Sequence, residues 1–292
     1  MRRLGWLVVL ALPLVFGCGS GDDDDGAPGT GGTSGGGSAG AGGDDSVPGD
    51  CDEPTPYDLE DVSGKWAYLE VQTLLVTSSL TGDFNNRVVS LQLFDVTQTG
   101  TELSIAASWC DRYIVDPDAP VRAVLPNEFV AALEDSTLEG SYSQDGAGTW
   151  HLEVSNWYMM QGAELEDITN PELIPTEPDD PTVVDQDQDG QPGMTVELQG
   201  VMQGATYVVQ WSRLSLDGIP VSEDRIQGLL DFDAREVVLA SEPALIRDLV
   251  EPSIPNPDAC QSFFVLIRMP EDADCTAINE QRNTLFPELP TG

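Results

Sequence analysis

Val96-Thr97-Gln98-Thr99-Gly100-Thr101-Glu102-Leu103 is the stretch that decides the fold of this chain. Two alternating runs rich in β-branched residues flank a turn that contains Gly100, and this arrangement predicts a β-hairpin. We expect its two strands over residues 87–98 and 101–109. The sequence outside the hairpin repeats the same arrangement, with short runs of period two between turns that contain Gly, Pro or Asp.

Further strands are expected on both sides of this hairpin. Trp150, Leu152 and Val154 alternate with polar residues, which is the pattern of a half-buried strand. The other expected strands are 67–77, 137–143, 149–159, 194–202, 205–216, 225–231, 236–240 and 262–268. About nine or ten short strands with almost no helix predict an all-β fold, an antiparallel meander that closes as a barrel or folds as a sandwich.

The strands are expected to form a single β domain over residues 51–292. Within it, residues 116–126 contain three prolines and are expected to be a connector, and residues 128–133 one helical turn. Residues 162–193 form a long, acidic, Pro-rich insertion. Loops of that length inside a compact domain are usually functional or disordered.

The charge of the chain is its most extreme compositional feature. There are 51 Asp and Glu residues against 12 Lys and Arg, a formal net charge of −39. Such a surface repels nucleic acid and anionic lipid. We therefore expect no nucleic-acid partner.

The N-terminus has the organisation of an export signal. Met1-Arg2-Arg3 is a short basic head, and residues 4–16 form an apolar core of the length typical of a signal peptide. A membrane-spanning helix needs about 20 apolar residues, so this run is too short to span a bilayer. We expect residues 1–17 to be a signal peptide.

Gly17-Cys18 closes the apolar run and resembles the lipobox of bacterial lipoproteins, although Val15 and Phe16 depart from its commonest residues. The resemblance implies that a type II signal peptidase cuts before Cys18 and that the thiol is diacylated, commonly with palmitate. The protein would then be held on a membrane of the cell envelope through Cys18. Gly19, in place of an Asp, favours the outer membrane. The alternative is an ordinary signal peptide with a chance cysteine.

The segment that follows is expected to be a tether. Residues 18–50 are dominated by Gly, with seven Asp and no aromatic residue, Lys or Arg. A segment of this composition cannot build a core, so the sequence predicts disorder.

Four cysteines remain in the expected domain: Cys51, Cys110, Cys260 and Cys275. An even set in an exported protein predicts two disulfides. Three pairings are possible, and the sequence leaves them open.

Gly64-Lys65-Trp66, at the start of the first strand, resembles the Gly-x-Trp signature of lipocalins, which are small ligand-holding barrels. The resemblance covers this tripeptide only. It implies that Trp66 packs under an arginine near the last strand, for which Arg268 is the natural candidate. The alternative is a tryptophan that plugs one end of an unrelated barrel.

The stretch Asp185-Gln186-Asp187-Gln188-Asp189-Gly190 is the one specific candidate site. Asp185, Asp187 and Asp189 alternate, and Gly190 allows the turn by which the carbonyl of Gln191 joins the carboxylates. Hard oxygens in this arrangement suit Ca²⁺.

The flanks of this stretch decide which calcium loop it resembles. An EF-hand loop has Glu at its twelfth position, where this chain has Val196, and its flanks are helical, whereas residues 183–184 and 194–196 are strand-like. The stretch is closer to the Asp-x-Asp-x-Asp-Gly loops of thrombospondin type 3 repeats, in a single copy. We expect a structural calcium ion; the alternative is a solvated acidic turn.

Catalytic signatures are sparse. His151 is the only histidine and Lys65 the only lysine, and the chain has neither a Gly-x-Ser-x-Gly elbow nor a phosphate-binding loop that ends in Lys. Any Ser-His-Asp triad must use His151, which lies on the polar side of an expected strand. We do not expect an enzyme.

The sequence therefore predicts a membrane-anchored envelope lipoprotein whose β domain is a binding or interaction module. The ligand or partner, whether protein, glycan or lipid, is not named by the sequence. One alternative is a lipocalin-like carrier of a small apolar ligand, and a second is a hydrolase.

Overall fold

The computed structural model describes residues 54–76, 83–115, 119, 121–249 and 253–289, which all belong to one unit, Gly42–Gly292. The expected signal peptide, Cys18, the tether and Cys51 lie outside the described residues.

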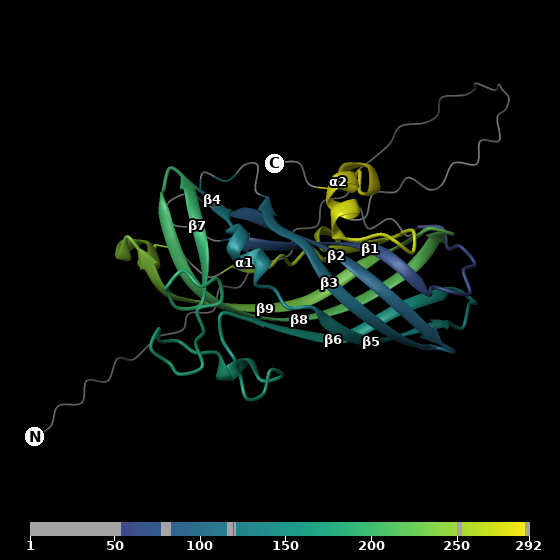
Figure 1. Cartoon of the computed structure of the whole chain (residues 1–292), viewed down its shortest axis with the longest axis horizontal. Coiled ribbons are helices and arrows are strands. Elements are labelled where there is room, and N and C mark those ends of the chain that lie inside the picture. The colour runs from purple at the N-terminus through teal and green to yellow at the C-terminus, as the bar shows by residue number, and fades with distance from the viewer. Residues whose placement is uncertain (1–53, 77–82, 116–118, 120, 250–252, 290–292) are drawn as a thin grey trace, which may run out of the picture. The chain divides into compact units, whose positions relative to one another are not determined.

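Eight strands of one antiparallel sheet form a closed ring. In their order around the ring, each strand pairs with the next one along the chain, and the last pairs with the first (Figure 1). The strands are β1 (Gly64–Val76), β2 (Phe84–Thr99), β3 (Glu102–Val115), β5 (Ser136–Gln144), β6 (Trp150–Gln161), β8 (Gly204–Ser222), β9 (Arg225–Glu242) and β11 (Phe263–Arg268). The fold is therefore the predicted all-β meander, closed as a barrel.

Three further strands extend the sheet. β4 (Val121–Val124) pairs with β7 (Met194–Gly200), and β7 pairs with the first residues of β8. The two-residue strand β10 (Ile254–Pro255) pairs with the end of β1. In Figure 1, β4 and β7 lie together at one end of the barrel, beside the short helix α1 (Asn127–Ala131).

The second helix, α2 (Cys275–Leu285), was not predicted from the sequence. Its N-terminus is capped by Asp274, whose Oδ1 accepts a hydrogen bond from the backbone N–H of Ala277 at 2.9 Å. Three short 3-10 helices complete the described chain: Pro171–Leu173, Ala244–Asp248 and Ala259–Gln261.

Two strand predictions were wrong in detail. β4 lies inside the expected connector 116–126, and the expected strands 225–231 and 236–240 are one continuous strand, β9. In both cases the cause is a strand pairing that the local sequence does not reveal. β9 pairs along almost its whole length with the equally long β8, and β4 forms against β7, which is distant in sequence.

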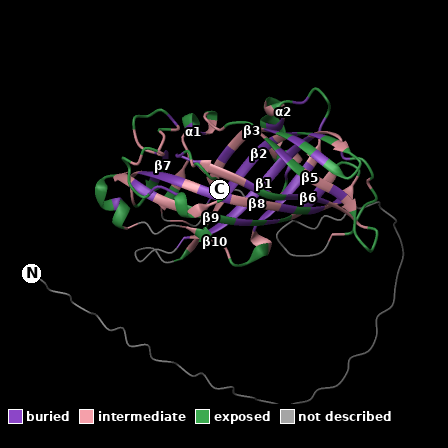
Figure 2. Ribbon diagram, turned by 90° about the horizontal axis from the view of Figure 1, so that it is seen from below, coloured by how far each residue is buried: buried purple, intermediate pink, exposed green. Residues whose placement is uncertain are grey.

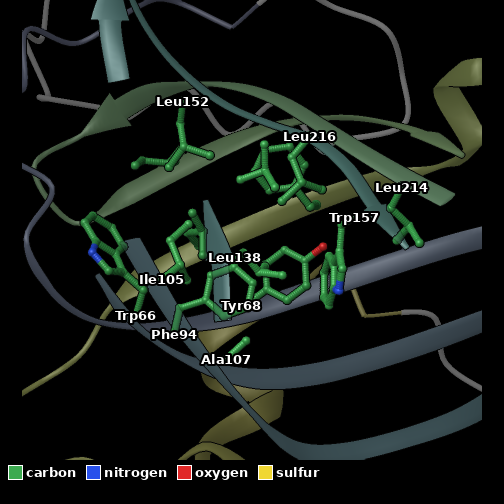
Figure 3. Packing of buried hydrophobic residues seen from close by; sticks show 14 of the residues in the cluster. Trp66, Tyr68, Phe94, Ile105, Ala107, Leu138, Leu152, Trp157, Leu214 and Leu216 are labelled. Carbon is green, nitrogen blue, oxygen red and sulfur yellow. The ribbon is translucent and has the colours of Figure 1, made fainter. Parts of the chain in front are cut away.

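The first strand is buried on both of its faces. Trp66 and Tyr68 point into the barrel, where Tyr68 stacks on Phe94 with ring centroids 4.3 Å apart (Figure 3). Leu69 and Val71 point outward and pack under the segment 269–289, which includes α2. Figure 2 shows the resulting run of buried residues along β1 and its neighbours.

Ring closure is reinforced where β11 meets β1. The guanidinium of Arg268 lies over the Trp66 ring, 4.2 Å from its centroid, so the contact predicted for this pair is confirmed. Arg268 also donates hydrogen bonds to the backbone carbonyls of Ser63 and Asp61, at 2.9 and 3.0 Å. A cation–π contact of this kind contributes about 1 kcal/mol.

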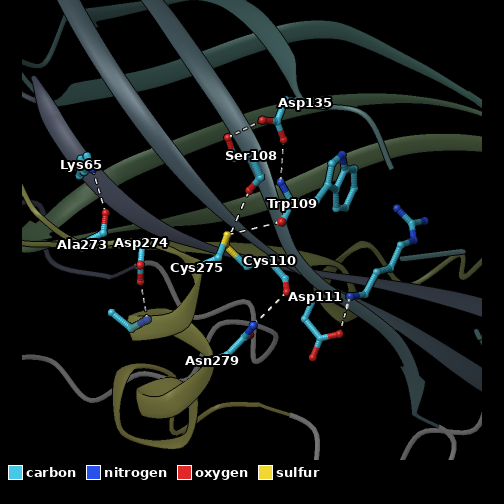
Figure 4. Close-up of a disulfide and its surroundings, with 12 residues drawn as sticks. Lys65, Ser108, Trp109, Cys110, Asp111, Asp135, Ala273, Asp274, Cys275 and Asn279 are labelled. Carbon is cyan, nitrogen blue, oxygen red and sulfur yellow. Dashed lines mark hydrogen bonds between the residues drawn. A yellow bond between two sulfur atoms is a disulfide. The ribbon is translucent and has the colours of Figure 1, made fainter. Parts of the chain in front are cut away.

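A disulfide joins Cys110 in β3 to Cys275 at the start of α2 (Figure 4). Beside it, the side-chain amide of Asn279 donates to the Cys110 carbonyl at 3.0 Å, and Arg282 pairs with Asp111 at 3.0 Å. Cys260 is also disulfide-bonded. The disulfide fixes α2 on the outside of the barrel.

Candidate functional site

A cavity of about 130 Å³ lies at the end of the barrel where β1 terminates, away from Trp66. Its walls are mostly apolar. Side chains from the barrel strands form one side: Leu74, Val76, Phe84, Val88, Ile114 and Val208. The other side comes from segments outside the ring: Val121, Ala123, Leu125, Phe129, Met194, Val196, Leu198, Met202 and Leu249.

The outer wall of the cavity has a core of its own. Phe129 of α1 is fully buried and packs with Met194, Val196 and Leu198 of β7. Because β7 continues the sheet from β8, these side chains are held beside the barrel mouth. The β4–β7 pair and α1 therefore enclose a space that an open barrel end would leave to solvent.

The cavity also has polar lining residues: Asn86, Arg112, Gln161, Thr206, Gln210, Glu236 and Ser253. Of these, Arg112 is the most consequential, because it is a cation only 3% exposed. Its guanidinium lies 5.5 Å from the Trp109 ring centroid. Burying a charge is costly unless the charge is paired. The partners of the Arg112 guanidinium therefore decide which ligand groups this cavity can bind.

Below the cavity, a network of buried polar groups surrounds Glu70. The Tyr68 hydroxyl donates to Glu70 Oε2 at 2.7 Å, and the Gln72 amide donates to Oε1 at 2.6 Å. The Ser90 hydroxyl makes a longer contact with Oε1 at 3.4 Å. Burial raises the pKa of Glu70 above its usual value, against the opposing effects of Arg112 and these donors.

Several buried polar atoms around this network have no hydrogen-bond partner among the described residues. They are Arg112 Nη1, Gln161 Oε1, Asn86 Oδ1 and both side-chain polar atoms of Gln92. Buried polar groups in folded proteins are paired as a rule, with protein, water or ligand. A concentration of unpaired atoms beside a cavity therefore indicates a place where a polar ligand group or water binds.

Glu236 is the second ionisable residue that lines the cavity. Burial raises the pKa of its carboxyl from 4.5 to about 7, and no neighbouring charge or donor offsets this effect. At neutral pH a large fraction of Glu236 is therefore protonated. In that form the carboxyl can donate a hydrogen bond as well as accept one.

The structure brings the three carboxylates among the four predicted calcium ligands together. Carboxylate oxygens of Asp185, Asp187 and Asp189 lie within 4.8 Å of one another. The turn is built as expected around Gly190, whose φ is +86° and whose N–H donates to Asp185 Oδ2 at 2.9 Å. The backbone N–H of Gln191 donates to Asp189 Oδ1 at 2.8 Å.

Asp187 is the least ordinary of the three acids. It is only 8% exposed, its Oδ2 accepts a hydrogen bond from the Thr195 N–H at 2.9 Å, and its buried Oδ1 has no partner among the described residues. Burial raises the pKa of Asp187, and the charge of Asp189 adds to the effect. A carboxylate with a free buried oxygen beside two others suits a cation.

The acidic insertion is packed against the barrel. Trp211 of β8 donates its indole N–H to the carbonyl of Ile168 at 2.6 Å, and Gln186 Oε1 accepts from the Gly162 N–H at 2.6 Å. Ala163 and Ile174 bury their side chains with Trp211. The loop 185–190 is thus positioned on the outside of the barrel.

The two residues considered for catalysis, His151 and Lys65, make contacts that hold parts of the fold together. His151 lies on the outer side of β6, with Nδ1 3.0 Å from Asp217 and Nε2 3.7 Å from Asp145. Lys65 donates to the carbonyl of Ala273 at 2.8 Å and so ties the 269–289 segment to β1. Neither residue lines the barrel cavity.

Sequence reasoning missed the polar residues of the barrel interior, such as Glu70, Arg112 and Glu236. The signal present in the sequence was the alternation of polar and apolar residues in the strands. That alternation divides a strand into two faces, but it does not say which face is turned inward.

Comparisons with known proteins give no relative from which a function can be carried over. No protein-family model, curated protein or solved structure significantly matches this chain. Over the described part of the chain, neither helix has the length and hydrophobicity that spanning a membrane requires.

We predict that Glu236→Gln removes a pH-dependent loss of stability. The carboxyl stays protonated in the folded state up to about pH 7, whereas in the unfolded chain it ionises near its usual value. The free energy of unfolding therefore falls as pH rises between these two values, by at most about 1.4 kcal/mol per pH unit, and levels off above. In urea unfolding from pH 5 to 8, the variant should gain on the wild type across this window.

Asp233→Asn is the matched control, because Asp233 is an exposed acid on the same strand. It should leave the difference from wild type independent of pH. A constant difference between Glu236→Gln and wild type over this range would contradict a raised pKa for this half-buried carboxyl.

Proposed function

We propose that this protein is a lipid-anchored envelope lipoprotein whose barrel binds a small, largely apolar ligand in the cavity at the end that β4, β7 and α1 enclose. The observation that carries the proposal is the cavity itself, which is lined mostly by aliphatic and aromatic side chains and has a few polar groups at its base. Concave apolar sites with a few convergent polar groups are typical of small-molecule binding. Of the functions predicted from the sequence, the carrier of a small apolar ligand agrees best with this geometry.

The size of the cavity limits the ligand. Its volume of about 130 Å³ is similar to that of an apolar protein cavity of roughly 150 Å³ that binds benzene. A ligand of about six to ten non-hydrogen atoms fits this space. The proposal therefore concerns a small molecule and not a long-chain lipid or a polymer.

The anchor is supported by the sequence. A basic head, an apolar core of signal-peptide length, Gly17-Cys18 and a Gly-rich segment follow one another as in bacterial lipoproteins. Two acyl chains on Cys18 would hold the protein stably on a membrane, since each buried methylene contributes about 0.8 kcal/mol. Gly19 supports the outer membrane as the location.

We further propose that the loop 185–191 binds a structural Ca²⁺ ion. The support is the convergence of three carboxylates and the unpaired, buried Oδ1 of Asp187. Asp185, Asp187, Asp189 and the carbonyl of Gln191 would supply hard oxygen ligands. The ion would neutralise part of the acidic insertion and stabilise its packing on the barrel.

Ligand binding is tested with 1-octanol, a neutral molecule of suitable size, and the unacylated Cys18→Ser chain. We expect a Kd of about 10–100 μM by calorimetry, from burial of the alkyl chain less the cost of association.

A cavity-filling variant tests the location of the site. Val88→Trp, which fills the cavity from β2, should abolish binding. Asp95→Trp places the same side chain on an exposed position of that strand and should bind normally. Equal binding by both variants would rule out the cavity as the site.

The lipid anchor is tested by expression in a bacterium with radiolabelled palmitate. The wild-type chain should carry label and sediment with membranes after a high-salt wash. Cys18→Ser should lose both properties because no thiol is left to acylate. A labelled Cys18→Ser chain, or an unlabelled wild-type chain, would contradict the lipobox assignment.

Calcium binding is tested by the thermal midpoint at increasing calcium. A loop of this kind binds at about 10⁻⁴–10⁻³ M, so 10 mM calcium should raise stability by about 1.4–2.7 kcal/mol, which corresponds to several degrees. Asp187→Asn should lose this rise while remaining at least as stable without calcium, because it removes a buried unpaired charge. Glu166→Gln, which changes an exposed acid of the same insertion outside the loop, is the control. A rise of the same size in all three proteins would exclude the loop.

A further inference from the structure

The guanidinium of Arg112 is a buried cation that has no hydrogen-bonded partner among the described residues. Its side chain lines the barrel cavity, and Nη1 has neither solvent contact nor a hydrogen bond among the described residues. No hydrogen bond or ion pair joins its guanidinium to any residue that the structure describes. Its one close aromatic contact, with Trp109, leaves the N–H groups unused. A guanidinium presents five donors in a planar fork, so this site lacks an acceptor.

The acid expected to neutralise Arg112 is already engaged. Glu70 is buried in the same barrel interior, but its oxygens accept hydrogen bonds from Tyr68 and Gln72. Burial lowers the pKa of Arg112, and the charge of Glu70 opposes this effect through space, but no hydrogen bond or ion pair joins the two side chains. The barrel interior therefore holds a positive donor group that is available to whatever enters the cavity.

The other polar groups at the cavity base complete the site. Glu236 and Gln210 line the cavity, and the unpaired Oε1 of Gln161 lies at the same surface. Glu236 in its protonated form is a further donor. Most of the other lining side chains are apolar, with Leu74 and Leu198 among them. Polar groups at the base and apolar groups above them match a molecule with a head and a tail.

We propose that the cavity selects a small amphiphile with a carboxylate head, which binds the guanidinium of Arg112, while its alkyl or aryl tail contacts the apolar walls. A carboxylate fits the proposal because it accepts two parallel hydrogen bonds from an arginine fork and brings one negative charge to one buried positive charge. The inference rests on the proposed function, since it names the chemical class of the ligand for the same cavity.

Three probes of equal chain length separate head-group preference from tail binding: octanoate, 1-octanol and octylamine. Calorimetry is carried out at pH 6.5 with the unacylated Cys18→Ser chain, where octanoate is ionised and the amine is protonated. We expect octanoate to bind about ten-fold more tightly than octanol and octylamine to bind most weakly. In Arg112→Met the advantage of octanoate over octanol should disappear, while octanol binding stays within about three-fold.

Three variants control for other causes. Arg87→Met removes a different arginine, on the outer side of β2 near the cavity end, and should keep the octanoate preference. Arg213→Met removes a partly exposed arginine of β8 that does not line the cavity, and should keep it also. The double variant Glu70→Gln/Arg112→Met removes both buried ionisable groups, and it replaces Arg112→Met if that single variant does not fold.

The outcomes test ligand binding by the cavity and the carboxylate class of the ligand separately. If no probe binds, the proposed function fails, and this inference with it. If octanol binds at least as tightly as octanoate, or octylamine binds best, the cavity is a ligand site but the carboxylate assignment is overturned. An octanoate preference that survives in Arg112→Met overturns the role of Arg112.

Discussion

The pairing of β11 with β1 is the constraint on which the rest of the structure depends. Residues 263–268 pair with 66–71 and turn a linear meander into a ring without free edges. The paired residues are 192 to 202 positions apart in sequence, so their pairing carries a large loop-closure cost. Arg268 over Trp66 and its bonds to the carbonyls of Ser63 and Asp61 fix the register at the end of this seam.

Ring closure divides the barrel interior into two regions. Toward Trp66 the interior is filled with aromatic and aliphatic side chains, which exclude ligand and water. Toward the end of β1 the inward positions become polar at Glu70 and Gln72 and then apolar again at Leu74. Such a polar layer costs free energy unless its groups are paired, and here the pairing is incomplete. A ligand that formed hydrogen bonds with these unpaired groups would offset the free-energy cost of burying them.

Additional segments cover the outer faces of the barrel. The segment 269–289 lies over β1 and its neighbours and is tied down by the Cys110–Cys275 disulfide and Lys65 (Figure 4). The acidic insertion packs on Trp211 and Leu239, and the β4–β7 pair with α1 walls the cavity. Each of these segments buries apolar residues that would be exposed to solvent on the eight-stranded barrel alone.

The sequence by itself determined the local features. The hairpin at 96–103, the period-two strands and the all-β class follow from alternation and turn residues, and the convergence of Asp185, Asp187 and Asp189 follows from their spacing around Gly190. These features depend on neighbours in the chain.

Tertiary structure alone decided four other features, because each depends on contacts between distant residues. They are the closure as a barrel rather than a sandwich, the continuity of β9, the formation of β4 and the Cys110–Cys275 pairing. The polar cavity base is the clearest case. Alternation in β1 separates Glu70 and Gln72 from Leu69 and Val71, but α2 covers the aliphatic face from outside, and the polar face is therefore the one that turns into the barrel.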